Sequence, residues 1–181
     1  MDQTSLDAFA AVVRDAWAPI STELVATCRE ALAALTTADQ SEGWLAALLD
    51  EKPASRELVR DPRLGFMLLA HTENFGLYRP PHDHGRAWVV YGVQSGALQV
   101  RTYAKVMTAV GKPKLVQRDE VVLRPGEARA YLPGDIHDTQ CLSDTALLFR
   151  FTERDLRHED QVERQVTRFV DDGGDWTVGA A

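Results

Sequence analysis

Three histidines in two short blocks of the chain have the residue types and spacing of metal ligands. His82 and His84 flank Asp83, and His137 closes the turn-rich segment 133–137. Side chains two apart on a β-strand project from the same face, so we expect His82 and His84 to aim their imidazoles at one point. A third imidazole from another strand of a closed sheet would complete a facial set of ligands. The spacing therefore predicts a mononuclear metal site with open coordination positions.

The type of ligand limits which metals can bind and which reactions they can support. Neutral imidazole suits borderline metals, and each ring must be uncharged to ligate. Without a carboxylate ligand, a divalent ion keeps its full charge, which favours an anionic substrate atom such as a thiolate. We expect Fe(2+), with Zn, Ni or Mn as alternatives. The competing interpretation, two exposed loop histidines with His137 elsewhere, leaves unexplained why three of only five histidines fall in these two blocks.

Composition favours a small-molecule partner. The chain has 181 residues, 45% of them hydrophobic, and a net charge of −7. This length can bury a core as one unit, and the negative charge argues against nucleic acid or an anionic membrane surface as the main partner. No apolar run approaches the ~18 to 20 residues of a membrane span. Cys28 and Cys141 lie far apart, and residues 1–4 show no secretory segment, so we expect a reducing cytoplasm. We also expect a monomer or homodimer.

The first 54 residues carry the apolar spacing of helices. Plausible N-caps precede two periodic stretches, at Thr4-Ser5 and at Ser21-Thr22, and Pro19 interrupts the pattern between them. We expect two helices and a third short one around residues 42–49. This helical flank is predicted to pack on the outside of the segment that follows.

From residue 55 to 152 the pattern is that of short strands separated by turn signals. Many short strands at roughly 8 to 12 residue spacing point to an all-β sandwich or barrel. Residues 153–181 form a C-terminal helix and tail, with helical spacing over 155–170, and the whole chain is expected to be one domain. The predicted strands cover residues 64–70, 87–93, 97–104, 116–123, 128–132 and 146–151.

The two histidine blocks resemble the two motifs of the cupin superfamily, whose members form small jelly-roll barrels. The His-X-His precedes a glycine turn, and the second block follows an Arg-Pro-Gly-Glu turn at 124–127. Cupins usually carry a Glu three or four residues after the second His, but Ala87 and Trp88 stand there. The resemblance implies a cupin jelly-roll (double-stranded β-helix) barrel. Its three-histidine set is similar to that of cysteine dioxygenase and related thiol dioxygenases.

Likeness to the thiol dioxygenases implies iron-dependent oxidation of a small thiol to a sulfinate by O2. Those enzymes have a Thr-Arg-Asn-Leu-Val-like segment about twenty-six residues before the first His, and here Arg56 lies in a Ser-Arg-Glu-Leu-Val segment. The resemblance implies that Arg56 pairs with a substrate carboxylate, a two-pronged task suited to guanidinium. A surface ion pair with Glu51 or Asp61 is the alternative, and Arg60 and Arg63 are close competitors.

Other positions depart from that family. Arg150 and Thr152 occupy the places of a His and a Tyr that reach the iron-bound ligands, and Val89 stands at the partner Cys, so no thioether crosslink is expected. Arg150 would be a second anion-binding group if it faces inward, and an outward position is equally compatible with the sequence. Tyr91 is a candidate cavity hydroxyl. His71 is a candidate acid/base residue, with a hydrogen-bonded structural histidine as the alternative.

These observations predict a mononuclear non-heme iron dioxygenase that acts with O2 on a small acidic substrate, with a thiol among the candidates. The departures at Arg150 and Thr152 predict slow or absent turnover of cysteine itself. One alternative is a zinc, nickel or manganese cupin that acts as an isomerase, lyase or hydrolase without oxygen. The other is a non-catalytic ligand-binding cupin.

Overall fold

Three N-terminal helices form as the sequence predicts. The computed structural model describes residues 3–173 and 175–179, and its first elements are α1 (Ser5–Ala16), α2 (Thr22–Leu35) and α3 (Gly43–Glu51). The Thr4 side chain accepts a hydrogen bond from the Asp7 backbone N–H, and Asp7 returns one to Thr4, so α1 begins with a capping box. Ser21 caps α2 by accepting from the Leu24 N–H. Both predicted capping sites are confirmed, with the first residue of each pair as the cap.

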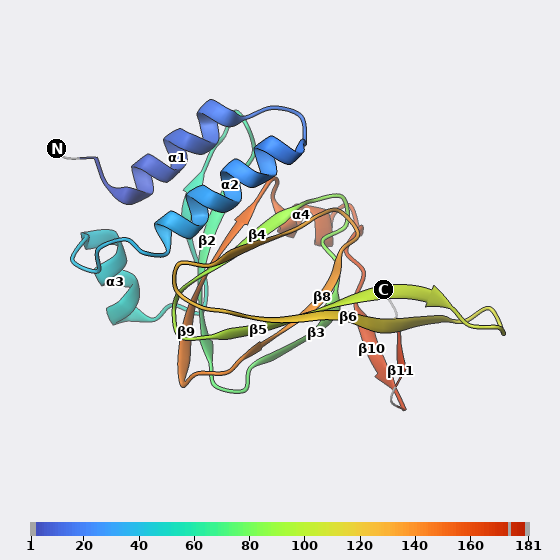
Figure 1. The fold of residues 1–181 in the computed structure, drawn as a ribbon. Coiled ribbons are helices and arrows are strands. Elements are labelled where there is room, and N and C mark those ends of the chain that lie inside the picture. The colour runs from blue at the N-terminus through green and yellow to red at the C-terminus, as the bar shows by residue number, and fades with distance from the viewer. Residues whose placement is uncertain (1–2, 174, 180–181) are drawn as a thin grey trace.

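Two antiparallel sheets make the body of the molecule (Figure 1). One has the order β1-β2-β9-β4-β7 and the other the order β3-β8-β5-β6. Strands that follow one another in sequence mostly alternate between the sheets, which is the arrangement of a jelly roll. The predicted jelly-roll barrel is confirmed. The strands are β1 (Arg56–Arg60), β2 (Met67–Asn74), β3 (Tyr78–His82), β4 (Val89–Ser95), β5 (Leu98–Met107), β6 (Pro113–Leu123), β7 (Ala128–Tyr131), β8 (Ile136–Cys141) and β9 (Thr145–Thr152).

Alternation along β9 assigns its side chains to two different cores. Phe149 and Phe151 belong to the apolar cluster that joins the five-stranded sheet to the helices, where Leu32 of α2 is fully buried. Leu148 points the other way, into the cluster between the two sheets. The helices therefore cover the outer face of the five-stranded sheet, as expected, and Arg150 shares the inner face with Leu148.

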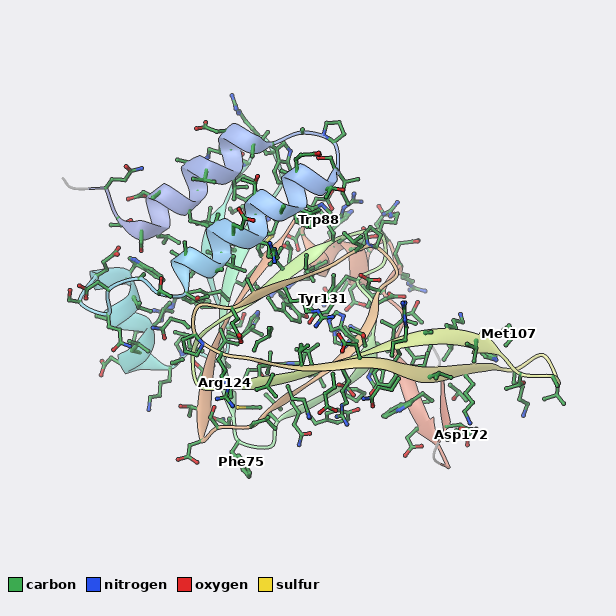
Figure 2. The ribbon with its side chains drawn as sticks, in the orientation of Figure 1. Phe75, Trp88, Met107, Arg124, Tyr131 and Asp172 are labelled. Carbon is green, nitrogen blue, oxygen red and sulfur yellow. The ribbon has the colours of Figure 1, made fainter. Side chains whose placement is uncertain are left out.

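The cores lie where the two sheets and the helices overlap. Trp88 sits under the helices and Tyr131 between the sheets, both almost fully buried (Figure 2). Burying side chains of this size contributes roughly 1.5 to 3 kcal/mol each. By contrast, the hairpin of β5 and β6 extends beyond the barrel, and Met107 at its end is 65% exposed (Figure 2). None of the described helices is long and apolar enough to cross a membrane.

The C-terminal helix is shorter than predicted. It is α4 (Leu156–Gln161), and a hairpin of β10 (Phe169–Asp172) and β11 (Asp175–Val178) follows it. The prediction of helix as far as residue 170 was wrong, because Arg164 has a φ of 51° and the next residues extend along the barrel. Phe169 then packs with Leu115 and Ile136 instead of on a helix face.

Candidate metal centre

The fold brings the three predicted histidines together. Ligand atoms of His82, His84 and His137 all lie within 4.8 Å of one another. His82 is the last residue of β3 and is the direct register partner of His137 on β8. His84 lies in the loop after β3, so the expectation that one strand presents both His82 and His84 was wrong. The turn after His82 brings the second imidazole back to the first.

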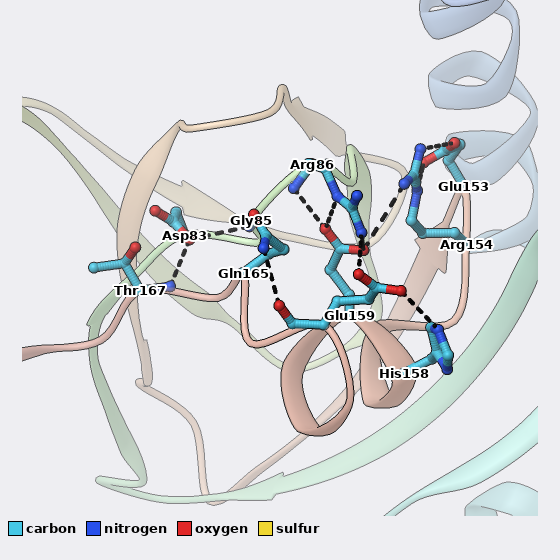
Figure 3. A network of polar contacts seen from close by, with 10 residues as sticks. Asp83, Gly85, Arg86, Glu153, Arg154, His158, Glu159, Gln165 and Thr167 are labelled. Carbon is cyan, nitrogen blue, oxygen red and sulfur yellow. Dashed lines mark hydrogen bonds and ion pairs between the residues drawn. The ribbon is translucent and has the colours of Figure 1, made fainter. Parts of the chain in front are cut away.

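Hydrogen bonds between that turn and the C-terminal segment fix its shape (Figure 3). Asp83 accepts from the backbone N–H of Gly85 at 3.0 Å and of Thr167 at 2.8 Å. The Asp83 N–H donates to the Thr167 carbonyl at 3.0 Å. Gly85 has a φ of +62°, and a Cβ there would lie 2.8 Å from that of Gln165. The loop that carries His84 is therefore built against residues 165–167.

Glu159 connects the same loop to α4 (Figure 3). Its side chain is 2% exposed and accepts from the backbone N–H of Arg86 at 2.9 Å and from its Nε at 2.9 Å and Nη2 at 3.1 Å. These hydrogen bonds hold the pKa of Glu159 below its ordinary value. Sequence reasoning missed this contact, because a Glu in a charged helix resembles a solvated residue. The position of His84 therefore depends on a carboxylate 75 residues further along the chain.

All three imidazoles are neutral at neutral pH. Burial is the main cause that lowers the pKa of His82, His84 and His137, and for His84 and His137 neighbouring imidazoles of the cluster add to the effect. The Nδ1 of His82 lies 2.9 Å from the carbonyl of Pro80, which leaves Nε2 as the atom with a free lone pair. Neutral imidazoles with inward lone pairs are the form that binds a metal. The donor set fits a borderline divalent ion, and the described cluster contains no carboxylate.

The Tyr91 hydroxyl lies against two of these ligands. It is 3.1 Å from Nε2 of His84 and 3.3 Å from Nε2 of His137. Burial raises the pKa of Tyr91, so the phenol keeps its proton. The Tyr131 ring stacks on His137 with centroids 4.2 Å apart and planes tilted by 30°. Tyr91 on β4 thus places a phenol beside the histidines, whereas Thr152 on β9 has no phenol to offer.

A second buried group fixes β8 from the other side. Asp138 follows His137, is fully buried, and accepts from the Tyr103 hydroxyl at 2.6 Å and the Tyr78 hydroxyl at 3.0 Å. Arg101 Nε donates to the same carboxylate at 3.1 Å. Since adjacent residues of a strand face opposite sides, these contacts hold the strand while His137 faces the cluster.

A cavity of about 750 Å³ opens onto the histidines. His82 and His84 line it, whereas His137 is fully buried behind them. Strands of the five-stranded sheet supply one wall, and α4 with the segment before β10 supplies the other. The sheet-side lining includes His71, Glu73, Tyr91, Leu148 and Arg150, and the C-terminal lining includes Leu156, Arg157, Asp160, Gln161, Val166 and Arg168.

The structure brings three of the four predicted catalytic candidates to this cavity. His71, Tyr91 and Arg150 line it, and Arg150 faces inward. Arg56 does not line it: its guanidinium forms an ion pair with Glu51 on the outside of the barrel. The surface ion pair considered as the alternative is the arrangement that the structure has. Sequence spacing placed Arg56 near the start of β1 but did not indicate which way its side chain points.

Comparisons with known proteins find distant structural similarities. No family model and no curated protein matches the chain. Among solved structures, KdgF from Halomonas sp. is 20% identical over 55% of this chain and 77% of its own, with a TM-score of 0.43. The cupin domain of Cnp3 from Schizosaccharomyces pombe is 9% identical over 59% and 64%, with a TM-score of 0.44. An oxalate oxidase in complex with the substrate analogue glycolate is 24% identical over 55% and 50%, with a TM-score of 0.40. The jelly-roll fold of the chain is shown by its own two sheets and their strand order.

Proposed function

We propose that this protein is a mononuclear non-heme iron dioxygenase that adds both atoms of O2 to a small acidic substrate, with a small thiol as the first candidate. The observation that carries the proposal is the cluster of three neutral imidazoles within 4.8 Å, without a carboxylate, at a cavity. Three neutral ligands leave a divalent ion with its full charge, which favours an anionic donor atom. A thiolate meets that requirement.

The chemistry balances without a further reductant. Ferrous iron at such a site supplies the one-electron chemistry that lets O2 react with a thiolate. Two S–O bonds form, the O–O bond breaks, and sulfur loses four electrons to both oxygen atoms, so thiolate and O2 give a sulfinate in equal amounts. No other electron donor is consumed.

Residues of the chain supply the remaining requirements. The Tyr91 hydroxyl, next to His84 and His137, offers a hydrogen bond to a group bound between them. Leu148 and the buried ring of Tyr131, which stacks on His137, give the sheet side an apolar surface.

Oxygen uptake tests the proposal. The iron-loaded protein is given 3-mercaptopropionate, cysteine, and a panel of aromatic and hydroxy acids under air, with His82→Ala as the blank and His158→Ala, an exposed histidine, as the matched control. We expect uptake with an acid other than cysteine in the wild type and in His158→Ala, with product and O2 in equal amounts for a thiol. Absence of uptake with every compound, together with oxygen-independent conversion by a zinc, nickel or manganese form, would overturn it.

A further inference from the structure

Arg150 stands beside the metal centre on the inner face of the five-stranded sheet. It is the direct register partner of Tyr91 on β4. Directly opposed residues of an antiparallel pair have Cβ atoms about 4.5 to 5.5 Å apart. The Tyr91 hydroxyl contacts His84 and His137, and Arg150 lines the same cavity as His82 and His84.

The guanidinium of Arg150 has no anionic partner among the described residues. Its Nε is buried without a hydrogen-bond partner, and burial lowers its pKa. The nearby carboxylates are engaged elsewhere: Glu73 pairs with Arg79 at 2.7 Å and Asp155 with Arg60 at 3.1 Å. A partly buried charge without a partner is costly, and an anion that enters the cavity would offset that cost.

The rest of this wall carries no net charge. Arg79 and Glu73 neutralise each other. His71 lies diagonally from Arg150, since its register partner on β9 is Leu148. Burial and then the charge of Arg150 lower the pKa of His71 to about 3, so its ring is neutral at neutral pH. The wall therefore offers one unbalanced positive charge, in the planar fork that matches a carboxylate.

We infer that Arg150 binds the carboxylate of the substrate, in the role that the sequence had suggested for Arg56. The substrate class is then a small monocarboxylate whose reacting atom lies only a few bonds from the carboxylate. The position of the reacting atom rests on the proposed function, whereas the carboxylate site rests on Arg150 alone. Arg56 is excluded from the role by its ion pair with Glu51 outside the cavity.

Anaerobic calorimetry on the zinc-loaded protein tests this assignment without turnover. The probes are 3-mercaptopropionate and its uncharged amide, 3-mercaptopropionamide, and the variants are Arg150→Met, Arg150→Lys and the matched control Arg56→Met. For 3-mercaptopropionate we expect the dissociation constant to rise about 10- to 100-fold in Arg150→Met, less in Arg150→Lys, and not in Arg56→Met. Binding of the amide should be the same in all four proteins. Equal binding of the acid by wild type and Arg150→Met, or equal weakening of acid and amide, would overturn the inference.

Thermal unfolding of the metal-free protein gives a second, independent readout. Propionate should raise the melting temperature of the wild type and leave that of Arg150→Met unchanged. Without propionate, Arg150→Met should melt at the same or a higher temperature than the wild type, because it removes an unpaired, partly buried charge. Propionate stabilisation without oxygen uptake by the iron form would leave the carboxylate site standing and reject the dioxygenase. Equal stabilisation of wild type and Arg150→Met by propionate would reject the carboxylate site.

Discussion

His71 should make the metal-free protein sensitive to acid. Its side chain is 9% exposed, and its pKa is lowered from an ordinary value of 6.5 to about 3, first by burial and then by the charges of Arg150 and Arg79. The unfolded chain therefore binds a proton at this residue between those two values, while the folded chain does not. Stability from neutral His71 is fully present above the unfolded pKa and is lost as the pH falls below it.

The size of the effect follows from linkage. One such group lowers the free energy of unfolding by about 1.4 kcal/mol per pH unit within its window. Between pH 6.5 and 4.5 this amounts to about 2 kcal/mol, after allowing for partial protonation near the upper limit. His71→Gln removes the titrating group and keeps a polar side chain of similar reach. Its free energy of unfolding should fall by about 2 kcal/mol less than that of the wild type over this interval.

Urea denaturation of the chelator-treated protein at both pH values measures the difference. The other buried histidines titrate in wild type and variant alike, so they cancel in the comparison. His158→Gln, at a side chain that is 58% exposed, serves as the control and should follow the wild type. If His71→Gln loses as much stability between the two pH values as the wild type does, the buried neutral state of His71 is refuted.

Three further substitutions test separate parts of the structure. Glu159→Gln should lower the free energy of unfolding by about 3 kcal/mol and weaken metal binding about tenfold or more, because the turn that carries His84 loses its charged partner. Unchanged curves in urea denaturation and chelator competition would contradict this. Gly96→Ala should lower the free energy of unfolding by about 2 to 4 kcal/mol, since its Cβ would lie 2.3 Å from the Thr145 carbonyl oxygen. Gly111→Ala, whose Cβ would have no atom within 4 Å, should lower it by about 1 kcal/mol in the same urea assay. Equal losses in the two variants would contradict this prediction. Tyr91→Phe should keep its metal, measured by elemental analysis, and lower kcat in oxygen uptake about 10- to 100-fold; wild-type turnover would remove the hydroxyl from the reaction.

Local signals in the sequence were sufficient for the three N-terminal helices, most strands of the barrel and the histidine cluster, but they missed β1 and β3. Thr4 and Ser21 act as caps through side-chain bonds to residues three positions away, which a linear sequence displays. The His-X-His spacing and the turn before His137 predicted the three histidines that the fold brings together, although a turn rather than a strand positions His84. Local pattern therefore predicted which residues come together, but not the backbone conformation that brings them there.

Long-range contacts were beyond the sequence. The bonds of Asp83 to Thr167 and of Arg86 to Glu159 join segments more than 70 residues apart, and they replace the helix that local spacing favoured after residue 161. The direction in which an arginine side chain points likewise depends on residues that are distant in sequence and close in space. Arg56 forms an ion pair with Glu51, whereas Arg150 points inward because successive side chains of β9 alternate between the helix side and the cavity.

Metal stoichiometry tests the central claim, that three imidazoles hold one ion, most directly. Elemental analysis after anaerobic purification and iron loading should give one ion per chain for the wild type and a small residual fraction for His137→Ala. Circular dichroism of the variant should stay β-rich, because apolar strands build the core. Full occupancy by metal in a folded His137→Ala protein would contradict the assignment of the site.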